Sequence, residues 1–280
     1  FIKQDKVELF DYKGKPVRAK VVEVNLKIDS IQKGGYPHFM LKEIHEQPVV
    51  IRQMIKKHLQ ENKIVFDHFG LTDKQLLQIK NITIVACGTA YHAGLVGRYL
   101  IEQLAGIPVT VDVSSEFRYR YPIIQKDTLV LAISQSGETA DTLAAVKEVK
   151  NKKTKVVSIC NVLGSSLARE SDGILYTQAG PEIGVASTKA YTAQLCMLFL
   201  VALHLAQIHK RLSHEQEINL VRDLERLPDI FDQILETRNK IAKIAQANSH
   251  FGCFLFLGRN VNFPSALEGA LKLKEISYIP

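Results

Sequence analysis

Short apolar runs alternate with amphipathic segments along the middle of the chain. Each apolar run has the length of a strand and ends in turn residues, a pattern typical of strands buried on both faces. The runs lie at 82–86, 109–113, 129–133, 156–159 and 173–176. Segments of helical spacing separate them, at 91–104, around 115–117, at 139–149 and at 166–170. The alternation predicts an α/β fold with an open five-stranded parallel sheet and helices on both faces.

Apolar residues at helical spacing predict further helices on either side of this sheet. Upstream, we expect a short helix over 72–79 and a longer one over 39–59, in which Pro48 predicts a kink or a new start. Downstream, we expect helices over 187–208, 213–224 and 228–247.

The end of the chain repeats the design of the sheet region. An apolar run at 251–257 is followed by Gly258 and by an amphipathic segment at 264–279, as strand, glycine turn and helix follow one another at 82–104. We therefore expect a second strand-and-helix subdomain to open here.

The first 37 residues follow a different pattern. Alternation around 11–16 predicts a hairpin, which is not stable alone, and the Gly and Pro content of 32–37 predicts a linker. The expected domains are a remnant of a neighbouring domain with its linker, a first subdomain, and a helical bridge with the start of the second subdomain. Their bounds are 1–40, 41–212 and 213–280.

Composition and charge narrow the class of protein. With 46% apolar and 23% charged residues, the chain is typical of globular proteins. Its net charge of +7 is spread along the sequence, which argues against a nucleic-acid interface. The four cysteines form no C-x-x-C pair, so we expect buried free thiols in the reducing cytoplasm and no metal site. No signal segment is visible, and the apolar stretch 195–206 is too short to cross a bilayer.

Three turns rich in glycine and hydroxyl residues follow predicted strands, at 87–90, 134–139 and 180–189. Ligands of open α/β sheets bind beyond the carboxyl ends of the strands, so we expect the three turns to converge. The turn 134–139 opens a helix whose free N–H groups favour an anion, and its hydroxyls suit a sugar phosphate. Plain helix capping is the alternative at each turn. Nucleotide-binding signatures are missing.

Glu268, Lys272 and Glu275 share one face of the last predicted helix. A solvent-facing row of ion pairs is one interpretation. The other is a carboxylate base beside an ammonium group, which could move a proton between C1 and C2 of a sugar. For His92, we expect a helix-surface or capping role.

Several of these motifs resemble one enzyme family. The segments 134–142, 182–189 and 266–278 closely resemble the isomerase half of the glutamine–fructose-6-phosphate aminotransferase (isomerizing) family, the glucosamine-6-phosphate synthases. The segment 35–48 looks like the linker that joins the glutaminase domain of that family to its isomerase domain. The fold implied is that of SIS (sugar isomerase) domains, which share the Ser-x-Ser-Gly turn.

The resemblance implies roles for ten residues. Those expected to hold the phosphate are Ser134, Gln135, Ser136 and Thr139. Those expected to contact the rest of the sugar are Thr89, Ala90, Val185 and Ser187. Glu275 is expected to be the base of the proton transfer, and Lys272 to handle a hydroxyl proton. The family usually has a hydroxyl residue in place of Ala90, so only a backbone contact is expected there.

The resemblance also implies a reaction and its partners. Fructose 6-phosphate is converted to glucosamine 6-phosphate with ammonia from glutamine, and glutamine is bound only by an upstream glutaminase domain. A cytoplasmic homodimer is implied, with no cofactor and with no nucleic-acid or membrane partner. The Cys that releases ammonia, the His that opens the sugar ring and the Lys that forms the Schiff base match no residue here. We therefore expect the 280-residue chain alone to bind sugar phosphate without turnover.

Two rival functions remain open at this point. A SIS-type module could bind sugar phosphate as a sensor without chemistry, although a sensor has no need for a carboxylate base at Glu275. A different phosphosugar isomerase or a deglycase would share the fold, although the hairpin and linker argue against it. A nucleotide-binding protein is the least favoured.

Overall fold

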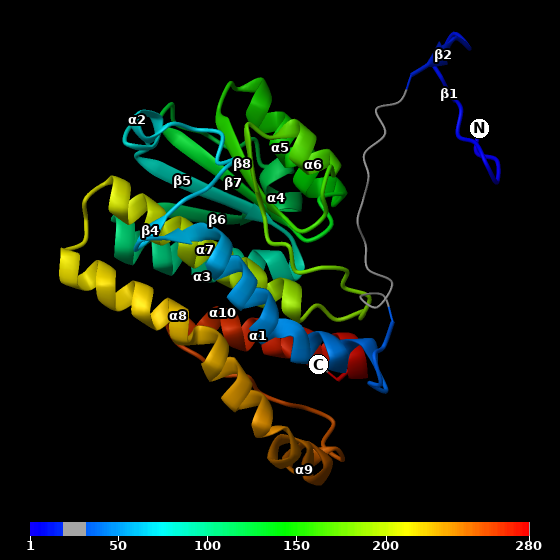
Figure 1. The fold of residues 1–280 in the computed structure, drawn as a ribbon, viewed down its shortest axis with the longest axis vertical. Helices are drawn as coiled ribbons and strands as arrows, with labels where there is room; N and C mark the ends of the chain where they lie inside the picture. Colours follow the sequence, from blue (N-terminus) through cyan, green and yellow to red (C-terminus); the bar gives the residue numbers. More distant parts are fainter. Residues whose placement is uncertain (19–31, 280) are drawn as a thin grey trace. The chain divides into compact units, whose positions relative to one another are not determined.

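The computed structural model describes residues 1–18 and 32–279, and the chain forms two compact units, Phe1–Gln32 and Lys33–Pro280 (Figure 1). In the first unit, β1 (Leu9–Phe10) pairs antiparallel with β2 (Pro16–Val17). The Asp11 carboxylate closes their turn by accepting the N–H groups of Lys13 and Lys15. This is the predicted hairpin, and the part of the expected alternation beyond residue 18 lies outside the described residues.

The second unit is built on the predicted five-stranded parallel sheet. Its strands are β5 (Asn81–Ala86), β6 (Val109–Val113), β7 (Thr128–Ser134), β8 (Lys155–Cys160) and β9 (Gly173–Tyr176). They lie in the order β6-β5-β7-β8-β9, with every neighbouring pair parallel. The strand order therefore reverses between β5 and β7, and the carboxyl ends of these two strands flank the position where ligands of such sheets bind.

The central strand β7 shows why a continuous apolar run becomes a strand rather than a helix. All seven of its residues are buried. Leu129, Leu131 and Ile133 belong to the core on one face of the sheet, and Val130 and Ala132 to the core on the other. Because successive strand residues point to opposite faces, only a run that is apolar throughout can fill both cores.

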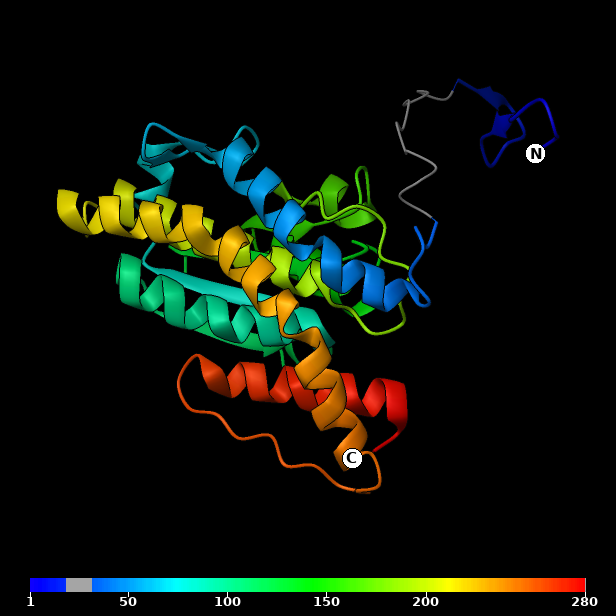
Figure 2. The ribbon, with the colours of Figure 1, turned by 60° about the horizontal axis from the view of Figure 1, so that its bottom comes forward.

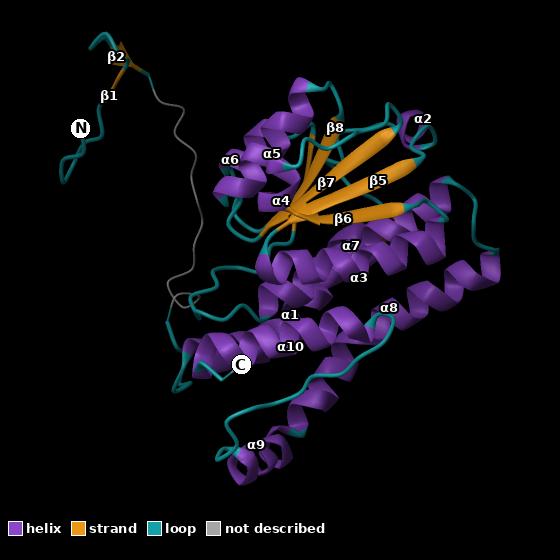
Figure 3. Ribbon diagram, turned by 180° about the vertical axis from the view of Figure 1, so that it is seen from behind, coloured by secondary structure: helices purple, strands orange, loops and turns teal. Residues whose placement is uncertain are grey.

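Helices cover both faces of the sheet (Figures 1 and 3). On one face lie α4 (Ser114–Tyr119), α5 (Ala140–Asn151) and α6 (Ser166–Glu170). On the other lie α3 (Gly88–Ala105) and α7 (Lys189–Ile208), which pack against each other. Gly97 permits the close approach of these two helices, because a Cβ atom there would lie 2.8 Å from a methyl carbon of Leu198.

Further helices form an outer layer on the α3–α7 side. The helix α1 (Phe39–His58) packs on α7 and on α8 (His214–Glu236), and α10 (Asn262–Ser277) packs on α3 (Figure 2). The smaller elements are α2 (Asp73–Leu76), α9 (Arg238–Asn248), β3 (Leu59–Gln60) and β4 (Lys63–Ile64). Among the described residues, α7 is the one helix long and apolar enough to cross a membrane, and most of that stretch is buried inside the fold.

Two prolines lie inside helices: the expected range of the helix around Pro48 is confirmed, whereas the helix boundary expected at Pro228 is wrong. Pro48 lies inside α1 without a new start, and the side-chain amide of Gln47 donates to the carbonyl oxygen of Ile44 that the missing proline N–H leaves free. Pro228 likewise lies inside α8, which runs on to Glu236. The apolar stripe of α8 continues past this proline, since Val221, Leu224 and Phe231 all pack on the same core.

The predicted strand at 251–257 is also wrong, because this segment forms no ladder with any described strand. Leu255 and Leu257 are 85% and 88% exposed. A strand needs a partner for its backbone N–H and C=O groups, and an apolar pattern cannot supply one. Cys253, expected to be buried in this strand, is consequently exposed, whereas Cys160 and Cys196 are buried as expected and Cys87 is half-buried.

Candidate functional site

A pocket of about 190 Å³ lies at the carboxyl ends of β5 and β7, where the strand order reverses. All three predicted turns contribute to its wall. The lining residues are Cys87, Thr89, Ala90, Ile133, Ser134, Gln135, Ser136, Thr139, Ser187 and Gln194. The structure therefore brings together seven of the eight residues expected to bind substrate. The remaining one, Val185, is 93% exposed and borders a separate cavity.

The turn after β7 is held in shape by its own hydroxyl groups. Ser134 Oγ accepts the N–H of Gly137 at 3.0 Å and hydrogen-bonds Thr139 Oγ1 at 3.0 Å, and Ser136 Oγ accepts the N–H of Glu138 at 3.1 Å. Gly137 has a φ of +67°, a conformation that other residues adopt only with strain. The turn is a pre-formed loop whose hydroxyls face one cavity.

Helix capping does not account for these hydroxyls. Thr139 occupies the N-cap position of α5, but its side chain makes no capping hydrogen bond, and Cys87 at the N-cap of α3 makes none either. Both helices thus begin at the pocket without a side-chain cap. The free N–H groups and the positive end of each helix dipole favour an anion in this position.

Glu138 ties the same turn to the neighbouring helix α6. Its Oε1 accepts the N–H of Ser166 at 2.7 Å, and this hydrogen bond holds the pKa of the Glu138 carboxyl below its ordinary value. Ser165 caps the same helix by accepting the N–H of Ala168. The turn after β7 is therefore positioned by contacts outside the pocket as well as within it.

The third turn reaches the pocket through Ser187. Glu182 accepts the Ser187 hydroxyl at 2.8 Å and the N–H groups of Thr188 and Ala190 at 2.9 and 3.1 Å. Glu182 therefore takes over the capping of α7, because Thr188 itself makes no side-chain cap. Val185 is exposed and does not line this pocket, while Gly184 and Ser187 in the same turn are held by hydrogen bonds.

The face of α10 that carries Glu268, Lys272 and Glu275 packs toward α3 rather than lining open solvent. Glu268 is only 4% exposed, accepts the Thr89 hydroxyl at 2.9 Å and lies 2.7 Å from His92 Nδ1. The interpretation as a solvent-facing row is therefore wrong for Glu268 and Lys272, whereas Glu275 at the end of the row of ion pairs is exposed. The expected surface or capping role of His92 is also wrong, because His92 is a partner of a buried carboxylate.

Lys272 connects this cluster to the pocket. Its Nζ donates to Thr89 Oγ1 at 3.1 Å and lies 3.3 Å from Glu268 Oε1 and 2.5 Å from Glu275 Oε2. Thr89 lines the pocket, and its hydroxyl binds Lys272, so the Thr89 side chain alone separates the pair Lys272 and Glu275 from the pocket. An ammonium group beside a half-exposed carboxylate is an arrangement suited to acid–base chemistry.

Sequence reasoning missed two residues of this region. Gln194 lines the pocket, and its Oε1 is buried without a hydrogen-bond partner among the described residues. The available signal was a polar residue directly before the apolar stretch 195–203 of that helix. Glu43 on α1 holds the turn before Ser187, and nothing in its spacing indicated this. Within residues 1–18 and 32–279, no group of three His, Cys, Asp or Glu side chains could hold a metal ion.

Residues 75–204 match the SIS domain family. The chain is 51% identical over 277 residues to the glutamine–fructose-6-phosphate aminotransferase [isomerizing] of Clostridium tetani, which covers 99% of this chain and 46% of the relative. It thus spans about half the length of the curated relatives it matches. The enzyme of Pseudomonas aeruginosa is 50% identical over 280 residues, again with 99% of this chain and 46% of the relative covered.

Solved structures agree with the sequence relatives. The C-terminal domain of glucosamine-fructose-6-phosphate aminotransferase from Francisella tularensis superposes with a TM-score of 0.83 at 43% identity, over 89% of this chain and 70% of that one. A glucosamine-6-phosphate deaminase from Thermotoga maritima shares the fold at a TM-score of 0.67 and 24% identity, over 86% of this chain and 68% of that one. The chain therefore belongs to the glutamine–fructose-6-phosphate aminotransferase (isomerizing) family, and its five-stranded sheet is the SIS domain of that family.

Proposed function

We propose that the pocket between β5 and β7 binds the phosphorylated six-carbon sugars fructose 6-phosphate and glucosamine 6-phosphate. The phosphate would be held by Ser134, Gln135, Ser136 and Thr139 together with the uncapped start of α5. Thr89, Ser187 and the backbone at Ala90 would contact the rest of the sugar. Val185 can take part only through its backbone, because its side chain is exposed. The observation that carries the proposal is the convergence of three hydroxyl-rich turns on one cavity.

We further propose that Glu275 moves the proton between C1 and C2 of the bound sugar and that Lys272 handles a hydroxyl proton. A base for this step needs a carboxylate whose environment is controlled by neighbours. Glu275 has Lys272 at 2.5 Å, and Lys272 in turn is fixed by Glu268 and Thr89. This anchoring would hold the pair at the edge of the pocket while the sugar is bound.

The complete reaction proposed is that of the family: fructose 6-phosphate and glutamine give glucosamine 6-phosphate and glutamate. The names of the relatives support this. Residues 1–40 would be the end of a glutaminase domain with its linker, 41–212 the first SIS subdomain, and 213–280 a helical bridge with the start of a second one. The enzyme would be a cytoplasmic homodimer without a cofactor, and the 280-residue chain would bind sugar phosphate without turning it over.

Binding is tested by titrating glucosamine 6-phosphate into the chain in a calorimeter. Ser136→Ala and Thr139→Val are each expected to weaken binding roughly ten- to a hundredfold, the effect of one lost hydrogen bond to a charged group. ATP and NAD should leave the melting temperature unchanged, whereas the sugar phosphate should raise it. Absence of sugar-phosphate binding to the wild-type chain contradicts the proposal.

The chemistry is tested in the complete enzyme by isotope exchange at C1 of fructose 6-phosphate. Exchange is expected in the wild type and should be lost in Glu275→Gln, which keeps the shape of the side chain and removes the base. Exchange that persists in this variant would rule out Glu275 as the base. Binding without exchange in the wild type would favour a sensor instead of an enzyme.

A further inference from the structure

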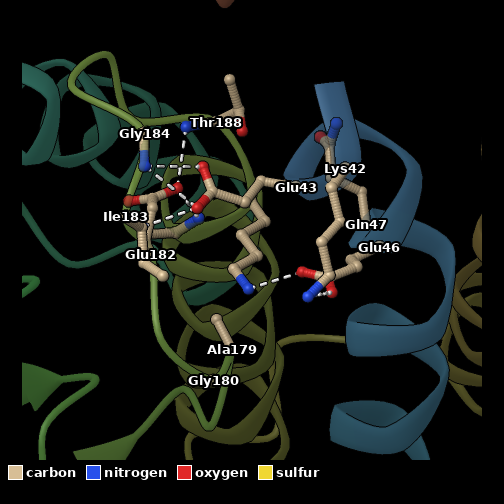
Figure 4. Close-up of polar contacts among 12 residues, drawn as sticks. Lys42, Glu43, Glu46, Gln47, Ala179, Gly180, Glu182, Ile183, Gly184 and Thr188 are labelled. Carbon is tan, nitrogen blue, oxygen red and sulfur yellow. Dashed lines mark hydrogen bonds and ion pairs between the residues drawn. The ribbon is translucent and has the colours of Figure 1, made fainter. Parts of the chain in front are cut away.

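The turn that carries Ser187 is fastened to the helix α1 by a buried carboxylate. Glu43 is 2% exposed. Its Oε1 accepts the N–H of Ile183 at 2.6 Å and the N–H of Gly184 at 3.1 Å, and its Oε2 lies 3.3 Å from the Gly184 nitrogen. Figure 4 shows this carboxylate beside the backbone of the turn. Hydrogen bonds from N–H groups to an ionised acceptor are stronger than those between neutral groups.

The turn approaches α1 so closely at Gly184 that no side chain fits there. A Cβ atom at this position would lie 2.6 Å from Glu43 Oε2 and 3.3 Å from the Cα of Met40. The first distance is shorter than any stable contact, so a larger residue would push the turn away from the helix. The hydrogen bonds of Glu43 therefore depend on glycine, and the position of the turn depends on both.

A second carboxylate continues this connection as far as the pocket. Glu182 directly precedes the two N–H groups that Glu43 holds, and it accepts the N–H of Thr188 (Figure 4). It also accepts the hydroxyl of Ser187. Ser187 lines the pocket. The path from α1 to the pocket thus consists of Glu43, the backbone of 183–184, Glu182 and Ser187, with a hydrogen bond or a peptide bond at each step.

The next turn of α1 fastens the start of α7 in the same manner. Glu46 Oε2 lies 2.6 Å from Nζ of Lys189, which is buried, and Gln47 accepts the hydroxyl of Thr192. Glu43, Glu46 and Gln47 are three and four residues apart, so they share one face of α1. This face holds α7 at two places and holds the turn before it at Glu43.

We propose that Glu43 is a positioning residue for the sugar side of the pocket: through Gly184 and Glu182 it sets the place of Ser187 without touching the ligand. The inference rests on the proposed sugar-phosphate function. The pocket then has two independently positioned sides, because the phosphate side formed by 134–139 is held by other contacts, those of Glu138 and Ser165 with α6. A defect at Glu43 should therefore weaken recognition of the sugar and spare recognition of the phosphate.

The experiment compares two probes, glucosamine 6-phosphate and inorganic phosphate, by calorimetric titration of the full chain. In Glu43→Gln and Gly184→Ala, the dissociation constant for glucosamine 6-phosphate should rise about five- to tenfold, the effect of losing the hydrogen bond between the displaced Ser187 hydroxyl and the sugar. The dissociation constant for inorganic phosphate should stay within about twofold of the wild type, because the turn after β7 is untouched. A purely structural defect would weaken both probes alike.

Two further variants keep the test decisive. Asp172→Asn is the matched control: Asp172 accepts the N–H of Val156 at 2.9 Å, at the opposite end of the sheet, and its loss should leave both dissociation constants unchanged. In a Glu43→Ala background, Gly184→Ala should cost less sugar affinity than it does alone, because the oxygen that its Cβ would meet is gone. The Glu43→Ala variant replaces Glu43→Gln in the comparison of the two probes if Glu43→Gln fails to fold, and Gly184→Ala carries the comparison if both fail.

Each outcome decides between the proposals. If the wild-type chain binds no glucosamine 6-phosphate, the proposed function is wrong and the inference falls with it. If the wild type binds the sugar phosphate and the Glu43 and Gly184 variants bind it equally well, the inference alone is overturned. Equal loss for both probes, or independent effects of Glu43 and Gly184, would also overturn it.

Discussion

Gly137 in the turn after β7 offers a sharp test of how this loop is built. Its φ of +67° is left-handed, and a Cβ atom there would lie 2.2 Å from Ser165 Oγ and 2.5 Å from Ser165 Cβ. Gly137→Ala therefore introduces two separate costs. The first is backbone strain, and the second is a collision with the N-cap residue of α6.

The two costs can be estimated separately. A left-handed conformation costs a residue with a Cβ atom about 1–2 kcal/mol. Crowding one extra carbon into a packed contact costs about 1–3 kcal/mol more, because either the loop or α6 must shift. We therefore expect Gly137→Ala to lower the free energy of unfolding by about 2–5 kcal/mol and to weaken sugar-phosphate binding, since the displaced loop carries Ser134 and Ser136.

Gly164 is the matched control for the strain alone. Its φ is +66°, and a Cβ atom there would meet nothing within 4 Å. Gly164→Ala should thus cost about 1–2 kcal/mol and leave ligand affinity unchanged. Both variants are compared by urea unfolding and by titration with glucosamine 6-phosphate.

Removing the collision provides the second comparison. Ser165→Gly deletes the two atoms closest to the new Cβ and leaves Cys160 Sγ at 3.3 Å. As a cap residue replaced by glycine, it costs only a few tenths of a kcal/mol, roughly, by itself. When Gly137→Ala and Ser165→Gly are combined, the free energy of unfolding should therefore rise to near that of Gly164→Ala. The reasoning is refuted if Gly137→Ala is no less stable than Gly164→Ala, or if Ser165→Gly restores nothing.

Three more predictions follow from buried groups. Glu268→Ala should lower the free energy of unfolding by about 1–3 kcal/mol in urea titrations, more than Glu275→Ala, because it strands buried polar partners; equal effects would contradict the packing of α10. Burial lowers the pKa of His204 below its ordinary 6.5, so the unfolded chain binds more protons than the folded chain as the pH falls. The free energy of unfolding in urea titrations should therefore decrease from about pH 7.5 to about pH 5.5, and less steeply in His204→Gln. A flat profile would refute this. Burial raises the pKa of Cys160 to about 12, so iodoacetamide at neutral pH should label exposed Cys253 first, as peptide mass spectrometry would show.

Much of the fold could be predicted from local pattern, because the core of a parallel sheet imposes it residue by residue. Strand β7 must be apolar at every position to fill two cores, and its boundaries are those of the apolar run to within one residue on each side. The same logic placed the helices between the strands and the three turns after them. The prediction failed where local pattern was ambiguous. A helix boundary was expected at Pro228, although a continuous apolar stripe carries α8 through it, and a kink or new start was expected at Pro48, where the Gln47 side chain makes the hydrogen bond that proline cannot make.

The candidate site likewise has features that the local sequence pattern predicts and features that it does not. The hydroxyl groups of the pocket were visible in sequence, since the turns 134–139 and 180–189 both follow predicted strands and combine glycine with hydroxyl residues. The geometry of the site was not visible in the sequence. Spacing along α10 placed Glu268, Lys272 and Glu275 on one face, but only packing against α3 shows that this face meets Thr89 and His92. Contacts of this kind join residues about 180 positions apart, which no local pattern encodes.

The sequence alone therefore determined the sheet, the hydroxyl-rich turns at its carboxyl end and the resemblance to an enzyme family, because short-range pattern and turn chemistry dictate all three. The tertiary structure decided which charged groups are buried, which of them face each other, and which turn is held from outside the pocket. Glu43 on α1 and Gln194 on α7 belong to this second class. Their roles depend on helices and turns that come together only when the chain folds.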